Sequence, residues 1–254
     1  MYFFGNSKPE EMISKIEDTA HYAPIINYRY ERWFHQVQYN GKVLNDAERK
    51  KFINVSDETI AVYSEGLPMI KKTLEQINGL QDEYHEVYTI VITVMQFTLI
   101  TLLDSMVLSK YFILADKDYD RRLMRGKLMV VLNEGFKKLY GFSKNTRKKS
   151  EWDKLSPILD YFPEAINNQY HELSSLLEKY YSTSSWWKEV RDLETHLDAD
   201  KMYESRCEKV IESKVIMDAQ RLINPLLAVN NFLFNMHSCI NNFLLDLYQK
   251  GVLK

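Results

Sequence analysis

Three residues late in the sequence could act together in chemistry: Arg191, Asp192 and His196, within the segment RDLETH. Imidazole titrates near neutral pH, so His196 could take a proton from a reacting group and return it. The planar guanidinium of Arg191 could hold a phosphate through two hydrogen bonds, and Asp192 could orient the imidazole. On RNA, such groups support attack of a 2′-hydroxyl on its own phosphodiester, because the base takes the proton and the cation stabilises the phosphorane. The alternative is that Asp192 and His196, four positions apart, form a surface pair on one helix face.

The spacing constrains how such a site would be built. On an uninterrupted helix, five positions correspond to about 500°, which leaves Arg191 and His196 about 140° apart. The two side chains reach one phosphate only if the helix loosens near His196. The run Asp198-Ala199-Asp200 follows directly and could end the helix there.

The pattern resembles the R-x(4 to 6)-H motif of the HEPN superfamily, helical-bundle proteins that include metal-independent ribonucleases of toxin and phage-defence systems. The likeness includes the polar Asp192 after the arginine, and it extends loosely to the helical pattern of residues 56–254. It implies an all-α fold, RNA as the substrate, catalysis by Arg191 and His196, and a site shared across a homodimer. A second match, Arg29 to His35, has Tyr after the arginine and lies outside the expected bundle, so we regard it as accidental.

A basic segment precedes this motif. Residues 117–150 contain eleven Lys or Arg against three acidic residues, a local balance of +8 that leaves −10 for the rest of a chain with net charge −2. Six basic residues stand between Gly135 and Ser150 with no acidic residue among them: Lys137, Lys138, Lys144, Arg147, Lys148 and Lys149. Tyr140 and Phe142 lie among them, so the segment predicts phosphate contact with some base stacking. The alternative is a solvated linker. Three arginines on one turn of the preceding helix could extend the surface: Arg121, Arg122 and Arg125.

Several other kinds of chemistry find no support in the sequence. No His or Cys cluster stands at metal-ligand spacing, so we expect no metal and no other cofactor. Cys207 and Cys239 are the only cysteines and are interpreted as reduced residues on helices, which argues against a disulfide framework. Residues 1–5 contain no basic region and no sustained apolar run, so the cytoplasm is the expected location.

Composition and periodicity indicate a helical protein. The chain has 254 residues, of which 45% are hydrophobic, and it contains only 8 Gly and 6 Pro, fewer turn residues than a β-sandwich uses. Apolar residues repeat with the helical period in the long segments. We therefore expect an all-α bundle of long antiparallel helices over residues 56–254, with a small helical N-terminal extension over residues 1–55.

Start and stop signals place the helices of the bundle. The first helix should begin near Ser56, where Ser-Asp-Glu puts negative charge at the positive end of the helix dipole, and end at Asn78-Gly79. Ser156-Pro157 should start another helix, and Pro225 should kink the last one. The remaining helices are expected over residues 82–115, 119–139, 186–197 and 203–249.

Residues 87–103 contain no charge over 17 positions, which is close to the length of a membrane span. The stretch includes four threonines and a glutamine and runs into Asp104, so we expect a buried core helix and no membrane contact. Asp104 should then pair with a base such as Lys127 or lie at the surface.

Together these features favour a HEPN-like helical protein that binds RNA and cleaves it without a metal. The alternative is a non-catalytic interaction or scaffold protein of the same fold, in which the Arg191 and His196 pair is incidental. A membrane-associated helical protein would rest on residues 87–103 alone.

Overall fold

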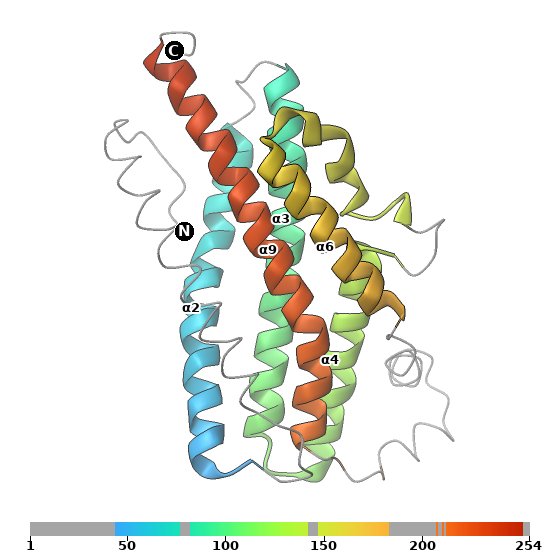
Figure 1. The fold of residues 1–254 in the computed structure, drawn as a ribbon. Coiled ribbons are helices and arrows are strands. Elements are labelled where there is room, and N and C mark those ends of the chain that lie inside the picture. The colour runs from blue at the N-terminus through green and yellow to red at the C-terminus, as the bar shows by residue number, and fades with distance from the viewer. Residues whose placement is uncertain are drawn as a thin grey trace.

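The computed structural model describes residues 44–76, 82–141, 147–182, 207, 210 and 212–250. These residues form helices and no strand, which confirms the expected all-α bundle (Figure 1). The helices are α2 (Asp46–Gln76), α3 (Asp82–Leu114), α4 (Asp118–Leu139), the 3-10 helix η2 (Asp153–Tyr161), α6 (Glu164–Ser182) and α9 (Glu212–Gln249). The expected helix over residues 186–197 and most of the N-terminal extension lie outside the described residues.

The apolar helix α3 is the centre of the bundle. It packs against α2, α4 and α9, and side chains such as Ile92, Met95 and Leu102 have no exposed surface. The stretch His85–Leu114 is long and apolar enough to cross a membrane, but 61% of its apolar window is buried within the bundle. That burial is compatible with the core helix of a soluble protein, as expected for residues 87–103.

The first described helix begins earlier than Ser56. At its start, the Asn45 side chain accepts a hydrogen bond from the Glu48 N–H at 2.9 Å, and the Glu48 carboxylate accepts one from the Asn45 N–H at 2.9 Å. This reciprocal capping box satisfies two N–H groups that the helix itself leaves without partners. Ser56 instead lies buried within α2, so the expected start there is wrong. The helix also continues through the boundary expected between residues 55 and 56.

The helix expected to start at Ser156-Pro157 is replaced by two elements. Pro157 lies inside η2, and the chain is extended at Phe162, with φ −115° and ψ 155°. Proline disfavours the α conformation of the residue before it, so Pro163 keeps Phe162 extended and separates η2 from α6. The carbonyl of Pro163 then accepts the Ile166 N–H at 2.9 Å, which begins α6.

Helices α3 and α4 approach each other closely at Gly135. A Cβ atom added there would lie 2.3 Å from Cγ2 of Thr101 on α3. Only glycine therefore permits this spacing of the two helices.

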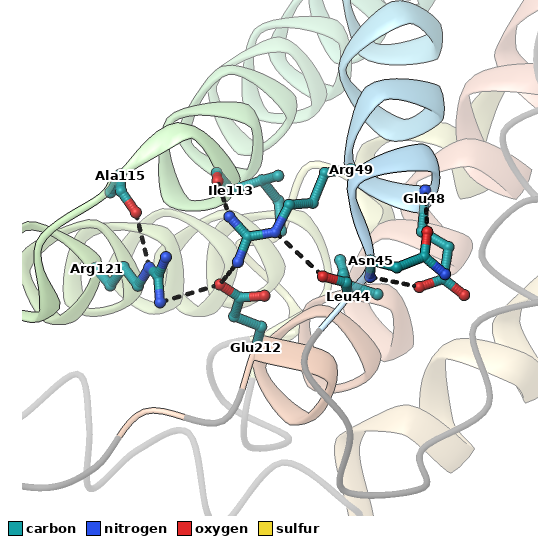
Figure 2. Close-up of polar contacts among 8 residues, drawn as sticks. All are labelled: Leu44, Asn45, Glu48, Arg49, Ile113, Ala115, Arg121 and Glu212. Atoms are coloured by element: carbon teal, nitrogen blue, oxygen red, sulfur yellow. Dashed lines mark hydrogen bonds and ion pairs between the residues drawn. The ribbon is translucent and has the colours of Figure 1, made fainter.

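A buried ion cluster ties four helix ends together (Figure 2). Glu212, in the first turn of α9, is 1% exposed and contacts Arg49 of α2 at 2.5 Å and Arg121 of α4 at 3.1 Å. The two guanidinium groups also donate to backbone carbonyls at the end of α3, from Arg49 to Ile113 at 3.5 Å and from Arg121 to Ala115 at 2.7 Å. Helices α2, α4 and α9 thus begin at the end of the bundle where α3 finishes, so α3 runs antiparallel to all three.

The last helix, α9, continues through Pro225 to Gln249. The kink expected at Pro225 stays a prediction. The side chain of Asp104 on α3 is exposed, and within the described residues it makes no ion pair with Lys127, which is also exposed. Of the two expected arrangements, an ion pair with Lys127 or a position at the surface, Asp104 therefore adopts the second.

Candidate functional site

The catalytic residues expected from the sequence, Arg191, Asp192 and His196, lie outside the described residues, as does Lys144. Their arrangement therefore stays a prediction. The part of the chain that the structure describes contains no cluster of three or more His, Cys, Asp or Glu side chains placed to hold a metal ion.

The structure brings the other five basic residues to the C-terminal end of α4. Lys137 and Lys138 lie in the last turn of α4, which ends before Gly141, a residue with φ 85°. The turn that enters η2 folds back on this helix end, because the Glu151 N–H donates to the Lys138 carbonyl at 3.0 Å and the Trp152 N–H to the Leu139 carbonyl at 2.9 Å. Arg147, Lys148 and Lys149 belong to this turn.

A cluster of aromatic rings holds the turn in place. The Trp152 ring is 2% exposed and stacks on Tyr170 of α6, with ring centroids 4.8 Å apart. It also contacts Phe232 of α9, at a centroid distance of 5.3 Å, and its Nε1 donates to Ser174 Oγ at 2.9 Å. The basic turn therefore rests on a rigid support formed by η2, α6 and α9.

Three of the five basic side chains have acidic partners. Lys137 pairs with Glu134 at 3.4 Å, Lys138 with Glu151 at 3.3 Å and Arg147 with Glu178 at 2.6 Å. Glu151 is 6% exposed and also pairs with Lys154 at 2.7 Å. The five described residues of the predicted basic surface are thus partly neutralised by carboxylates from α4, α6 and the turn itself.

Tyr140 is not positioned to stack on a base. It is 7% exposed, and the Arg147 guanidinium carbon lies 4.8 Å from the centre of its ring. Its hydroxyl donates to Glu178 at 2.9 Å. Burial, together with this hydrogen bond, raises the pKa of Tyr140 to about 12, although the charge of Arg147 opposes the shift. Arg147, Tyr140 and Glu178 therefore join α4 and the turn to α6, and the expected stacking role of Tyr140 is wrong.

Lys148 and Lys149 are the basic residues of this group that remain available. Both side chains are exposed, and neither makes an ion pair within the described ranges. They stand next to each other on a turn that its neighbours hold firmly. We call this pair of residues the lysine turn.

The arginines of the first turns of α4 do not extend this surface. Arg121 belongs to the ion cluster with Glu212, and Arg122 contacts Asp118 at 3.9 Å. From Arg121 to Lys138 the rise along the helix is about 25 Å. The two basic groups therefore occupy opposite ends of α4.

A second polar group, which the sequence did not predict, lies inside the bundle. The Tyr88 hydroxyl is 3.2 Å from Nε2 of His237 and donates to Oδ1 of Asn241 at 3.2 Å, while Nδ2 of Asn241 is 3.2 Å from Nδ1 of His237. These bonds form a closed ring when His237 is neutral and carries its proton on Nε2. Burial lowers the pKa of His237 to about 3 and raises that of Tyr88.

This polar ring is not suited to acid-base chemistry near neutral pH, because each donor is already paired and the imidazole stays uncharged. His237 and Asn241 are four positions apart on α9, a spacing visible in the sequence. Tyr88 lies 149 positions away from His237, and no local pattern connects the two.

Comparison with known families, with curated proteins and with solved structures finds no match to this chain. The resemblance to the HEPN superfamily accordingly rests on the motif from Arg191 to His196 and on the helical architecture.

Proposed function

We propose that this protein binds single-stranded RNA through the lysine turn and cleaves it with Arg191 and His196. The observation that carries the proposal is the exposed pair Lys148 and Lys149, which makes no ion pair with any described residue and lies on a turn held by Trp152 and Arg147. Two lysines on a turn whose backbone is held can bind adjacent phosphates without the cost of ordering a loose loop.

The proposed reaction needs only two side chains at the scissile phosphate. His196 removes the proton of the 2′-hydroxyl, and the resulting oxygen attacks the neighbouring phosphorus. The bond between phosphorus and the 5′-oxygen breaks, and the protonated His196 returns its proton to that oxygen, which leaves a 2′,3′-cyclic phosphate and a 5′-hydroxyl. Arg191 stabilises the negative charge of the phosphorane.

The binding step is tested by the variant Lys148→Ala/Lys149→Ala. We expect weaker retention of a single-stranded RNA and a salt dependence reduced by about 1.4 in log K against log[salt], because each lost phosphate contact on a single strand removes about 0.7. The matched control is Lys50→Ala/Lys51→Ala, which removes the same charge from exposed positions at the opposite end of the bundle. Equal binding by wild type and the Lys148/Lys149 variant would contradict the proposal.

A second candidate function is that of a helical interaction protein, and the outer face of α3 favours it. Apolar side chains on this face recur at alternating intervals of three and four residues, interrupted by Asp104: Phe97, Ile100, Val107, Tyr111 and Leu114. Ile100, Tyr111 and Leu114 are 40%, 54% and 44% exposed. This is the spacing with which one helix packs along another in a coiled coil.

The partner that we propose for this face is a second copy of the chain. Asp104 would sit within the interface, and the exposed Lys127 of the neighbouring α4 offers the complementary charge from the other protomer in an isologous pair. Sedimentation equilibrium tests this: we expect a dimer that the variant Ile100→Lys/Tyr111→Lys converts to a monomer. A wild-type monomer at high concentration would exclude this partner.

A further inference from the structure

A cavity of about 440 Å³ lies where the beginning of α3, the junction of η2 with α6 and the end of α9 meet. Its lining includes Tyr88 of α3, Phe162 and Pro163 of the junction, and Cys239 and Ile240 of α9. This volume falls within the range of about 300–1,000 Å³ that is usual for small-molecule sites. Lys148 and Lys149, the described residues assigned to RNA binding, do not line it.

The lining determines the charge of a suitable ligand. Within the part of the chain that the structure describes, it contains no Asp, Glu, Lys, Arg or His side chain. The hydroxyl of Tyr88 is already used in the ring of hydrogen bonds with His237 and Asn241. An ion placed here would lose its hydration without gaining a partner, so the cavity selects against charged molecules.

The aromatic side chains of the lining further narrow the class of ligand that the cavity could bind. Four aromatic rings border the cavity, from Tyr88, Tyr161, Phe162 and Phe243. Tyr161 and Phe243 are 53% and 43% exposed, so a ligand that covers them removes apolar surface from water. Ring edges and faces pack favourably on a flat aromatic system. The amide of Asn242 is a polar group of the lining with which a ligand could form a hydrogen bond.

We propose that this cavity binds a neutral, largely aromatic small molecule. Binding joins α3, α9 and the junction of η2 with α6 at the end of the bundle opposite the Glu212 ion cluster, because each of these contributes residues to the lining. A ligand that occupies the cavity therefore stabilises the folded chain.

The first test is a fluorescence titration with 1-aminoanthracene, a neutral aromatic probe. We expect saturable binding of one probe per chain, unaffected by Lys148→Ala/Lys149→Ala. Ile240→Trp, which places an indole in the cavity, should weaken binding at least tenfold. Decanoate, an anionic aliphatic molecule, should not displace the probe. Binding that fails to saturate, an unchanged affinity in a folded Ile240→Trp variant, or displacement by decanoate would overturn the proposal.

A second measurement tests whether the probe binds in the cavity if Ile240→Trp does not fold. Cys239 lines the cavity and Cys207 is exposed elsewhere, and these are the only two cysteines. In Cys207→Ser, alkylation by N-ethylmaleimide therefore reports on Cys239 alone. We expect saturating 1-aminoanthracene to slow this alkylation at least fivefold. An unchanged rate with bound probe would place the probe elsewhere and reject the cavity as its site.

Discussion

Glu212→Gln is the substitution whose consequence follows most directly from the structure. The amide has nearly the shape of the carboxylate and can still accept hydrogen bonds from Arg49 and Arg121. What it lacks is the negative charge between the two guanidinium groups. The variant therefore isolates the electrostatic part of the cluster in Figure 2.

The magnitude depends on how deeply each charge is buried. The Glu212 side chain is 1% exposed, whereas those of Arg49 and Arg121 are 21% and 17% exposed. Removing one partner from a fully buried ion pair costs about 3–5 kcal/mol. Both arginines keep some water and a backbone carbonyl acceptor, so we expect a loss of about 2–3 kcal/mol in the free energy of unfolding.

Urea denaturation followed by circular dichroism measures this loss. With a slope of about 2–3 kcal/mol per molar urea, the midpoint should fall by about 1 M. The matched control is Asp246→Asn near the other end of α9, where Asp246 and Lys250 form an exposed pair at 2.6 Å. It should change stability by less than about 0.5 kcal/mol. Equal midpoints for Glu212→Gln and Asp246→Asn would refute the idea that the buried charge holds the helix ends together.

Two further predictions concern the core. Gly135→Ala should cost about 1–3 kcal/mol, because its Cβ would lie 2.3 Å from Cγ2 of Thr101, and Thr101→Ser, which deletes that methyl, should restore most of the loss in urea denaturation. Since burial lowers the pKa of His237 to about 3, the unfolded chain binds its proton more readily. The stability contributed by neutral His237 should therefore be lost as pH falls from about 6.5 towards 3, with a slope of up to about 1.4 kcal/mol per pH unit. His237→Gln should flatten that slope, and identical pH profiles for the two proteins would contradict the assignment.

The helix that dominates the fold was predictable because its signal is local. Residues 87–103 form a long uncharged, mainly apolar run, which is typical of a buried helix and not of a loop. This run forms the central part of α3. The start of α2 was missed because two signals compete. Ser56 with Asp57 and Glu58 has the composition of a helix start, but the capping box of Asn45 and Glu48 begins the helix earlier.

The candidate site was less predictable, because its charges are neutralised by residues that are distant in the sequence. Glu178 reaches Arg147 only after η2 and α6 have packed against α4. Glu151 lies just beyond the counted segment and returns to Lys138 because the turn folds back on the helix end. A count of charges along the chain does not show these ion pairs. The sequence therefore predicted a larger unpaired positive charge than the structure has.

The polar ring around His237 likewise depends on residues that are distant in the sequence. The pairing of His237 with Asn241 needs only one helix, but the ring closes through Tyr88 of α3. A sequence shows which residues share a helix face, and the packing of α3 against α9 decides which faces meet.

Cleavage of RNA by the wild-type protein and by His196→Ala, both assayed in EDTA, decides whether this chain is a metal-independent ribonuclease. We expect wild type to cut single-stranded RNA to products ending in a 2′,3′-cyclic phosphate. We also expect the variant to retain most RNA binding but to cut about 10²- to 10⁴-fold more slowly, the usual cost of losing a general base. Arg191→Lys should be impaired as well, because lysine keeps the charge but lacks the bidentate fork. Wild-type protein that leaves a broad panel of RNAs uncut, or a His196→Ala variant that cuts at the wild-type rate, would contradict the account.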